Sequence, residues 1–157
     1  VTKLLYGWSK NSRVKNILFL CTGNSCRSVL AEAYMNAASG GQWQAFSAGS
    51  TPAGAVHPMA LATLKELGLP DAGYRSKSWN EFAGPDAPQM HQIVTVCDNA
   101  AGEACPVWPG HPATAHWPFP DPAKYQGSED AVRAHFREVF AMIKKRLDGF
   151  LADEVRR

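Results

Sequence analysis

In the segment NILFLCTGNSCRS, residues 16–28, a short apolar run leads into a turn, and a helical pattern follows at once. The run at residues 16–20 is typical of a strand that is buried on both faces. Apolar residues then recur at three- and four-residue spacing, as in an amphipathic helix: Leu30, Ala33, Tyr34 and Ala37. Gly40 and Gly41 end this pattern, as glycines commonly do after a helix. The segment therefore predicts a β-loop-α unit.

The alternation of strand and helix continues along the chain. Three more stretches of strand type follow, at residues 43–47, 93–96 and 114–117. Between the first two, Pro58 opens a helix that ends at Gly68. This helix should direct four apolar side chains inward: Met59, Ala62, Leu64 and Leu67.

The last helix is predicted to begin after Ser128, which caps it. Its apolar stripe repeats at helical spacing: Val132, Phe136, Val139, Phe140, Ile143, Leu147 and Phe150. We place residues 144–146, which are Lys, Lys and Arg, in its late turns, where cations suit the negative end of the helix dipole.

These elements predict an α/β fold with a single three-layer domain, in which a four-stranded parallel sheet is flanked by helices. Strands that alternate with helices pair in parallel through right-handed crossovers. A chain of 157 residues has the size at which one domain closes one core. We see no internal repeat or linker, so we take residues 14–157 as the domain and residues 1–13 as an N-terminal extension.

Composition and charge exclude several classes of function. The net charge of +2 and the absence of any Lys/Arg run longer than residues 144–146 give no indication of a nucleic-acid partner. No apolar run approaches the roughly 20 residues of a membrane-spanning helix, so we expect no membrane partner. The first 13 residues lack the apolar stretch of a secretory signal, which favours a cytoplasmic location. Four cysteines in a chain of this size then indicate reactive or redox thiols rather than a disulfide framework.

The turn after the first strand has the residues of an oxyanion site. Cys21 is followed by five residues and then by Arg27 and Ser28. Five residues can curl the backbone around one tetrahedral anion, so that its N–H groups and the start of the next helix point at the anion. Gly23 and Asn24 tolerate the positive φ that such a loop needs, and Arg27 can grip two oxygens. The predicted oxyanion-binding residues are Thr22, Gly23, Asn24, Ser25, Cys26, Arg27 and Ser28.

Cys21 is the predicted nucleophile of this loop. A helix N-terminus and a nearby cation lower the pKa of a thiol, so we expect Cys21 to ionise easily, with Ser28 as a hydrogen-bond donor to its sulfur. The alternative is an inert buried cysteine before an ordinary turn.

The motif CTGNSCRS at residues 21–28, followed by Ala-Glu-Ala at residues 31–33, resembles the low-molecular-weight tyrosine phosphatase superfamily, in particular its arsenate reductase branch. Three weaker matches appear in the family's order: Ser-Ala-Gly at residues 47–49, His-Pro at 57–58 and Asp-Pro at 121–122. The resemblance implies the same four-stranded parallel sheet. It also implies that Asp121 is the general acid, although Asp-Pro is a common turn opener as well.

Cys97 and Cys105 favour the reductase branch. Cys97 ends the third predicted strand, on the same sheet edge as Cys21, and Cys105 follows eight residues later. In the arsenate reductases that this chain resembles, the first cysteine attacks arsenate, the second forms a disulfide with it and releases arsenite, and the third attacks the second. The resemblance therefore implies a relay from Cys21 to Cys97 to Cys105, with thioredoxin or a glutaredoxin/glutathione system as reductant.

Other interpretations stay open at this stage. A low-molecular-weight protein tyrosine phosphatase would use Cys21 as nucleophile and Asp121 as general acid. In a non-catalytic oxyanion sensor or regulatory partner, the cysteines would only report the redox state. Cys26 either packs or forms a protective disulfide with Cys21. Asn24, Glu32 and Ser47 either stabilise the loop by hydrogen bonds, which we favour, or hold a monovalent cation as in some related reductases.

The histidines and tryptophans do not predict a further site. The five histidines show no metal-ligand spacing, so we predict neither a metal nor a cofactor, and we interpret His57 as a helix-start residue. Trp108 and Trp117 either line the cleft or merely pack.

Overall fold

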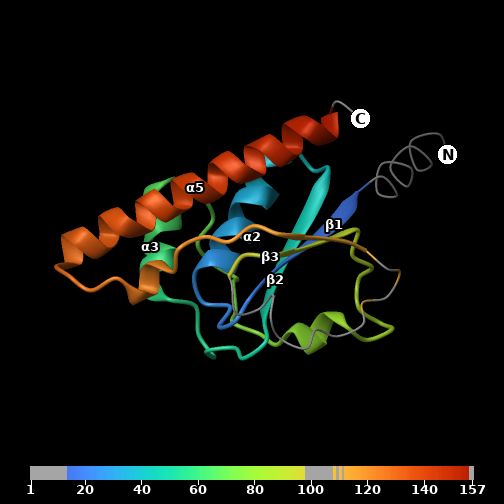
Figure 1. Cartoon of the computed structure of the whole chain (residues 1–157), viewed down its shortest axis with the longest axis horizontal. Coiled ribbons are helices and arrows are strands. Elements are labelled where there is room, and N and C mark those ends of the chain that lie inside the picture. The colour runs from blue at the N-terminus through green and yellow to red at the C-terminus, as the bar shows by residue number, and fades with distance from the viewer. Residues whose placement is uncertain (1–13, 98–107, 109, 111, 156–157) are drawn as a thin grey trace.

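The computed structural model describes residues 14–97, 108, 110 and 112–155. Its sheet has four parallel strands in the order β2-β1-β3-β4. These are β1 (Lys15–Cys21), β2 (Trp43–Gly49), β3 (Gln92–Thr95) and β4 (Ala113–His116). The predicted α/β class, strand number and parallel pairing are confirmed (Figure 1). The predicted N-terminal extension, residues 1–13, lies outside the described residues.

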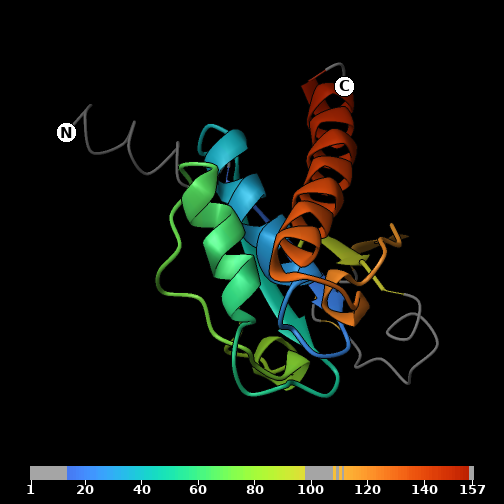
Figure 2. The ribbon, with the colours of Figure 1, turned by 90° about the vertical axis from the view of Figure 1, so that its left-hand side faces the viewer.

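Three α-helices cover one face of the sheet. They are α2 (Arg27–Ala38), α3 (Pro58–Glu66) and α5 (Glu129–Val155), and Figure 2 shows them packed side by side. Their apolar residues form one core with the strand side chains that point to this face, such as Ile17 and Phe19. None of the helices in the described part of the chain is long and apolar enough to cross a membrane.

The opposite face of the sheet carries a second, smaller core. Leu18 and Leu20 of β1 point to this face. They pack against Trp79 and Phe82 of the 3-10 helix η1 (Trp79–Phe82) and against Trp108. Strand β1 is thus buried on both faces, as its apolar run predicts.

The apolar stripes of the helices agree with the sequence patterns except at their ends. Leu67 is 45% exposed because α3 ends at Glu66 and the chain turns away at Gly68, which has a φ of +74°; the prediction that Leu67 points inward is wrong. Ala37, in the last turn of α2, is exposed as well.

The long last helix begins where predicted, since the Ser128 hydroxyl accepts a hydrogen bond from the Ala131 N–H. Its stripe is also confirmed, because Phe136, Ile143 and Leu147 are fully buried. The placement of residues 144–146 in the late turns is wrong. The helix continues to Val155, so these cations lie in its middle, where the dipole gives them no advantage.

Candidate active site

The loop between β1 and α2 forms the floor of a pocket at the carboxyl ends of the strands. The pocket has a volume of about 310 Å³. It is lined by Cys21, Thr22, Gly23, Ser25, Cys26, Arg27, Asp121 and Lys124. The structure therefore brings the predicted nucleophile, the loop, the predicted arginine and the predicted acid to one place.

The loop keeps its shape because its carbonyl groups bond to the surrounding backbone. The carbonyl oxygens of Cys21, Thr22 and Gly23 accept hydrogen bonds from the N–H groups of residues 50, 51 and 53. The Ser25 carbonyl accepts from the His57 N–H at 3.0 Å. With the carbonyl dipoles occupied in this way, the loop is suited to present N–H groups to an anion. Residues 50–57 are thus the scaffold of the loop, a role that the sequence motif does not reveal.

Two residues make the tight curl of the loop possible. Asn24 has a φ of +49°, in the left-handed region that Asn tolerates better than most residues. Gly23, which we also expected to need a positive φ, does not adopt one. Gly49, at the end of β2, lies so close that a Cβ atom on it would stand 2.5 Å from the Thr22 carbonyl oxygen.

The side chain of Asn24 fixes the direction of a hydrogen-bond chain to the nucleophile. Its Oδ1 accepts from the Lys77 backbone N–H at 2.9 Å, so its Nδ2 must face the two serines. Nδ2 donates to Ser28 Oγ at 2.8 Å and to Ser47 Oγ at 2.9 Å. Ser28 Oγ accepts from Asn24, and its own hydrogen is available to Cys21 Sγ, 3.0 Å away. This arrangement is compatible with Ser28 as the predicted donor to the sulfur.

The other end of this chain is the half-buried carboxyl group of Glu32. Ser47 Oγ donates to Glu32 Oε1 at 2.5 Å. Burial raises the pKa of Glu32, while the Ser47 hydrogen bond and the nearby Lys77 charge lower it. Asn24, Glu32 and Ser47 do gather, and the hydrogen bonds that we favoured link them. Among the described residues there is no cluster of His, Cys, Asp or Glu that could hold a metal ion.

Cys21 is 2% exposed, and its sulfur accepts from the Asn24 N–H at 3.2 Å. Burial is the largest influence on its pKa and raises it; the Ser28 and Asn24 hydrogen bonds and the Arg27 charge act in the opposite direction but are weaker. The expected lowering of the Cys21 pKa is therefore wrong for this structure, because desolvation of the thiolate outweighs the loop donors.

Arg27 and Asp121 face each other across the pocket. Arg27 Nη2 lies 3.5 Å from Asp121 Oδ2, and Arg27 Nη1 donates to the Phe119 carbonyl at 3.0 Å. The other oxygen of Asp121 accepts from the Ala123 N–H at 3.0 Å. Asp121 is therefore both the turn opener that Asp-Pro suggests and a pocket residue.

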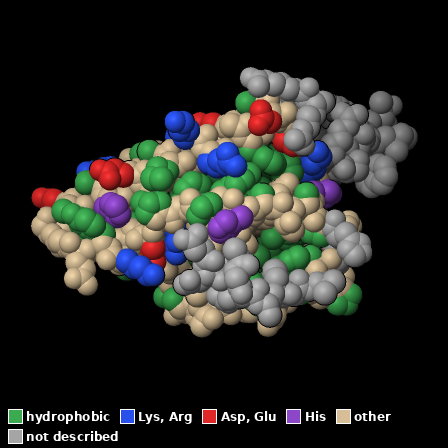
Figure 3. All heavy atoms as spheres, in the orientation of Figure 1, with side chains coloured by type: hydrophobic (Ala, Val, Ile, Leu, Met, Phe, Trp, Pro, Cys, Tyr) green, Lys and Arg blue, Asp and Glu red, His purple; other side chains and the backbone are tan. Residues whose placement is uncertain are grey.

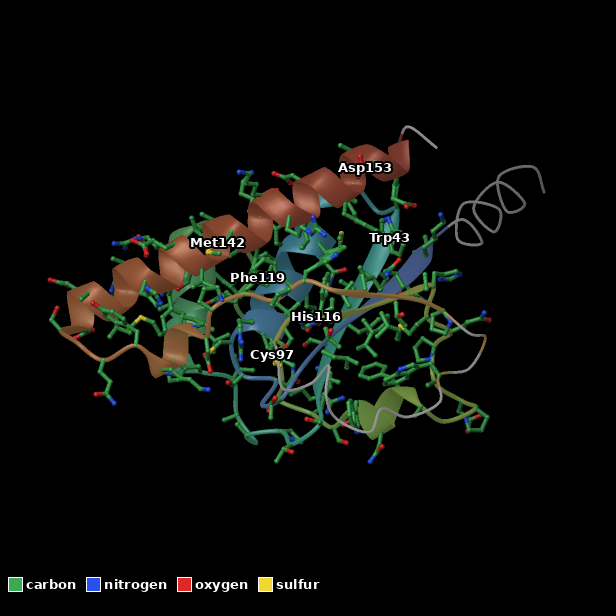
Figure 4. The ribbon with its side chains drawn as sticks, in the orientation of Figure 1. Trp43, Cys97, His116, Phe119, Met142 and Asp153 are labelled. Atoms are coloured by element: carbon green, nitrogen blue, oxygen red, sulfur yellow. The ribbon has the colours of Figure 1, made fainter. Side chains whose placement is uncertain are left out.

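The remaining predicted cysteines differ in their placement. Cys97 is buried just beyond β3, at the loop end of the sheet (Figure 4), and its sulfur lies 3.5 Å from Thr22 Oγ1. Cys26 is buried within the loop, and burial raises its pKa to about 12. Cys21, Cys26 and Cys97 are all free thiols. Cys105 lies outside the described residues.

Within the described part of the chain, no aromatic or histidine side chain lines this pocket. Trp108 packs on Trp79, and Trp117 packs on Phe150. His57 caps α3, as expected, by accepting from the Met59 N–H at 3.0 Å.

A second, larger pocket of about 560 Å³ lies between α5 and the segment after β4. Figure 3 shows hydrophobic side chains, with Lys and Arg beside them, on this face of the molecule. No predicted site residue lines that pocket.

Comparison with known proteins agrees with this geometry. The family model of low molecular weight phosphotyrosine protein phosphatases matches residues 16–157. The arsenate reductase of Bacillus subtilis is 38% identical over 136 residues, which cover 87% of this chain and 94% of that protein. The crystal structure of arsenate reductase from Archaeoglobus fulgidus has 31% identity and a TM-score of 0.68, over 87% of this chain and 98% of that one. A low molecular weight protein tyrosine phosphatase from T. tengcongensis has 25% identity and a TM-score of 0.65, over 86% and 99%.

Proposed function

This chain belongs to the low molecular weight phosphotyrosine protein phosphatase family, and from that premise we propose that it is an arsenate reductase acting in the cytoplasm. The observation that carries this proposal is the position of Cys97. A second buried thiol, 3.5 Å from the Thr22 hydroxyl, stands next to the loop that holds Cys21. Ester hydrolysis needs no second thiol, whereas a two-electron reduction by thiols does.

In the proposed first step, the Cys21 sulfur attacks the arsenic of arsenate, held by the loop N–H groups and Arg27. The Cys21 thiol passes its proton to the oxyanion as its sulfur attacks. Asp121 supplies the proton with which one arsenate oxygen leaves as water. The product of this step is a Cys21–S–arsenic(V) adduct.

In the second step, the Cys97 sulfur attacks the Cys21 sulfur, and the Cys97 thiol proton passes to an oxygen of the arsenic group. A disulfide forms between Cys97 and Cys21, and the electron pair of the sulfur–arsenic bond stays on arsenic, which leaves as arsenite. Two thiols are thereby oxidised by two electrons and arsenic(V) is reduced to arsenic(III). Cys105 then attacks Cys97, which releases Cys21 as a thiol. A dithiol partner of the thioredoxin type, or a glutaredoxin/glutathione system, reduces the resulting Cys97–Cys105 disulfide.

The proposal is tested by arsenite formation with and without a reductant. Without one, the reduced wild-type protein should form about one arsenite per chain, as a single relay allows. With thioredoxin or glutaredoxin systems, it should consume NADPH continuously when arsenate is added. Cys97→Ser should form no arsenite but should still hydrolyse p-nitrophenyl phosphate. Arsenite formation by Cys97→Ser at the wild-type rate would contradict the relay.

Phosphate-ester hydrolysis is the second candidate function. Cys21, Arg27 and Asp121 share one pocket, and this set contains a nucleophile, an anion-binding group and an acid, which suffice for ester hydrolysis. Rapid hydrolysis of p-nitrophenyl phosphate together with no arsenate-dependent thiol oxidation would make the chain a phosphatase and overturn the reductase proposal.

A further inference from the structure

The pocket contains a cation that the proposed chemistry does not use. Among the described residues that line it, the charged ones are Arg27, Asp121 and Lys124. Arg27 faces Asp121 at 3.5 Å, and both side chains are mostly buried, with 14% and 21% exposed. The charges of this pair cancel, so Lys124 gives the pocket its net positive charge.

The local fold fixes Lys124 next to the acid. Asp121 caps the 3-10 helix η2 (Pro122–Lys124), in which the Lys124 N–H bonds to the Asp121 carbonyl at 3.2 Å. Pro122 restricts φ at the first position of this turn. The backbone of Lys124 is therefore held one turn from Asp121, and its long side chain is exposed at the mouth of the pocket.

The next residue, Tyr125, belongs to a different surface. Its ring stacks on His135 of α5, with the ring centroids 4.7 Å apart and 23° between the planes. Tyr125 does not line the pocket. The side of the pocket that is formed by the residues after Asp121 therefore presents the Lys124 ammonium group and no aromatic ring. This suits a small oxyanion better than the aryl group of an ester.

An anion that enters the loop shares Arg27 with Asp121. Arg27 forms an ion pair with Asp121 at 3.5 Å, so only part of its charge is available to the anion. A second cation adds to the attraction for the anion, and Lys is suited to this task because its charge sits on a flexible stem.

We propose that Lys124 is a substrate-binding residue that recruits the small tetrahedral oxyanion to the Cys21 pocket. This inference rests on the proposed function for the identity of the oxyanion as arsenate. The binding of the anion itself, however, does not depend on reductase activity.

The test compares Lys124→Gln with Lys124→Arg and with Lys65→Gln, which removes an exposed cation from α3 outside the pocket. Lys124→Gln should raise the KM for arsenate about fivefold to tenfold, as expected for loss of one partly screened charge contact, with kcat nearly unchanged. Its kcat/KM should also depend less on ionic strength. Lys124→Arg keeps the positive charge and should restore most of the lost affinity for arsenate, whereas Lys65→Gln should behave like the wild type.

A second measurement makes the result independent of turnover. Inorganic phosphate should protect Cys21 from alkylation by iodoacetamide, which is measured by mass spectrometry of the Cys21 peptide. For the same protection, Lys124→Gln should need a phosphate concentration that is higher by about the same factor as its KM for arsenate. Unchanged KM and unchanged phosphate protection in Lys124→Gln would overturn the role of Lys124 even if arsenate is reduced. If the wild type reduces no arsenate but the phosphate effect is present, the proposed function fails and the role of Lys124 stands.

Discussion

The hydroxyl oxygen of Thr22 lies 3.5 Å from the sulfur of Cys97, which joins the anion loop after β1 to the end of the neighbouring strand β3. Strands β1 and β3 are paired in parallel, so their carboxyl ends meet at one edge of the sheet. The contact brings Cys97 to Thr22, which is the residue next to Cys21 in the loop. The Cys97 charge also contributes to raising the pKa of Cys21, which reflects the same proximity.

We first predict the effect of removing this hydroxyl. Thr22→Val keeps the shape of the side chain but cannot bond to the Cys97 sulfur. The rate of arsenite formation should fall about threefold to tenfold, as expected when one modest hydrogen bond is lost, and it should fall more than the rate of p-nitrophenyl phosphate hydrolysis. The ratio of the two rates is the measurement. Thr22→Ser should restore it, and an unchanged ratio in Thr22→Val would show that the contact does not assist Cys97.

The second prediction concerns the direction of the hydrogen-bond chain through Asn24. In Asn24→Asp, an oxygen replaces the Nδ2 atom that donates to Ser28 and Ser47. Ser28 should then turn its hydrogen to this oxygen instead of to Cys21, and the sulfur loses a donor. We expect at least a tenfold loss in the rate of Cys21 attack, measured as arsenate-dependent or p-nitrophenyl phosphate-dependent single turnover.

A matched variant separates this effect from loss of structure. Ser28→Ala removes the donor to Cys21 but leaves Asn24 in place, so it should slow the attack to a similar degree. Circular dichroism and urea unfolding should show both variants folded. If Asn24→Asp retains the wild-type rate while Ser28→Ala does not, the assigned direction is incorrect.

The motif at residues 21–28 predicted the position of the pocket because each requirement is local: a buried strand, a short loop and a helix start. The Asp121 position required a resemblance, since the structure brings it to Arg27 over a sequence separation that no local pattern reveals. The Cys21 pKa was misjudged because local dipoles are visible in a sequence, whereas the degree of burial depends on the whole fold.

The loop supports were missed for the same physical reason. Lys77 donates its backbone N–H to Asn24, and any residue other than proline has that group, so no side-chain pattern indicates it. The sequence indicates a binding role for Lys124 only weakly, by the presence of a cation three residues after Asp121. Its exposure at the pocket mouth, and the stacking of Tyr125 elsewhere, were needed to interpret it.

The third prediction uses the close approach of β2 to the loop. In Gly49→Ala, the new Cβ atom would meet the Thr22 carbonyl oxygen at 2.5 Å and the Asn24 nitrogen at 3.0 Å, so the loop must move. We expect a loss of about 1 to 3 kcal/mol in the free energy of unfolding and weaker phosphate protection of Cys21. Gly149→Ala is the matched control. A Cβ there meets nothing within 4 Å, and alanine in the α5 interior should stabilise the protein by up to about 1 kcal/mol. Equal stability of the two variants would contradict the predicted clash.

The fourth prediction is a pH dependence of stability away from the pocket. Asp148 of α5 accepts a hydrogen bond from the Tyr34 hydroxyl of α2 and pairs with Lys144 at 3.0 Å. The Tyr34 hydrogen bond is the main cause that lowers the pKa of Asp148 below its ordinary value of 3.8. Because the folded-state pKa lies below the unfolded-state pKa, the pair stabilises the fold above about pH 4, and this contribution disappears as the pH falls through the folded-state pKa.

Urea unfolding of wild type and Asp148→Asn tests this sign. The wild type should be more stable by about 0.2 to 1 kcal/mol at pH 7, since the Asp148 side chain is 45% exposed and water screens the interaction. The difference should stay constant down to about pH 5 and should close below pH 4 as Asp148 takes up a proton. In a Tyr34→Phe background, Asp148→Asn should change the free energy of unfolding much less, because the main hydrogen-bond donor to Asp148 is gone. Asp86→Asn, at an exposed loop position, controls for the loss of one negative charge. A difference that grows as the pH falls would mean that the Asp148 pKa is raised by folding.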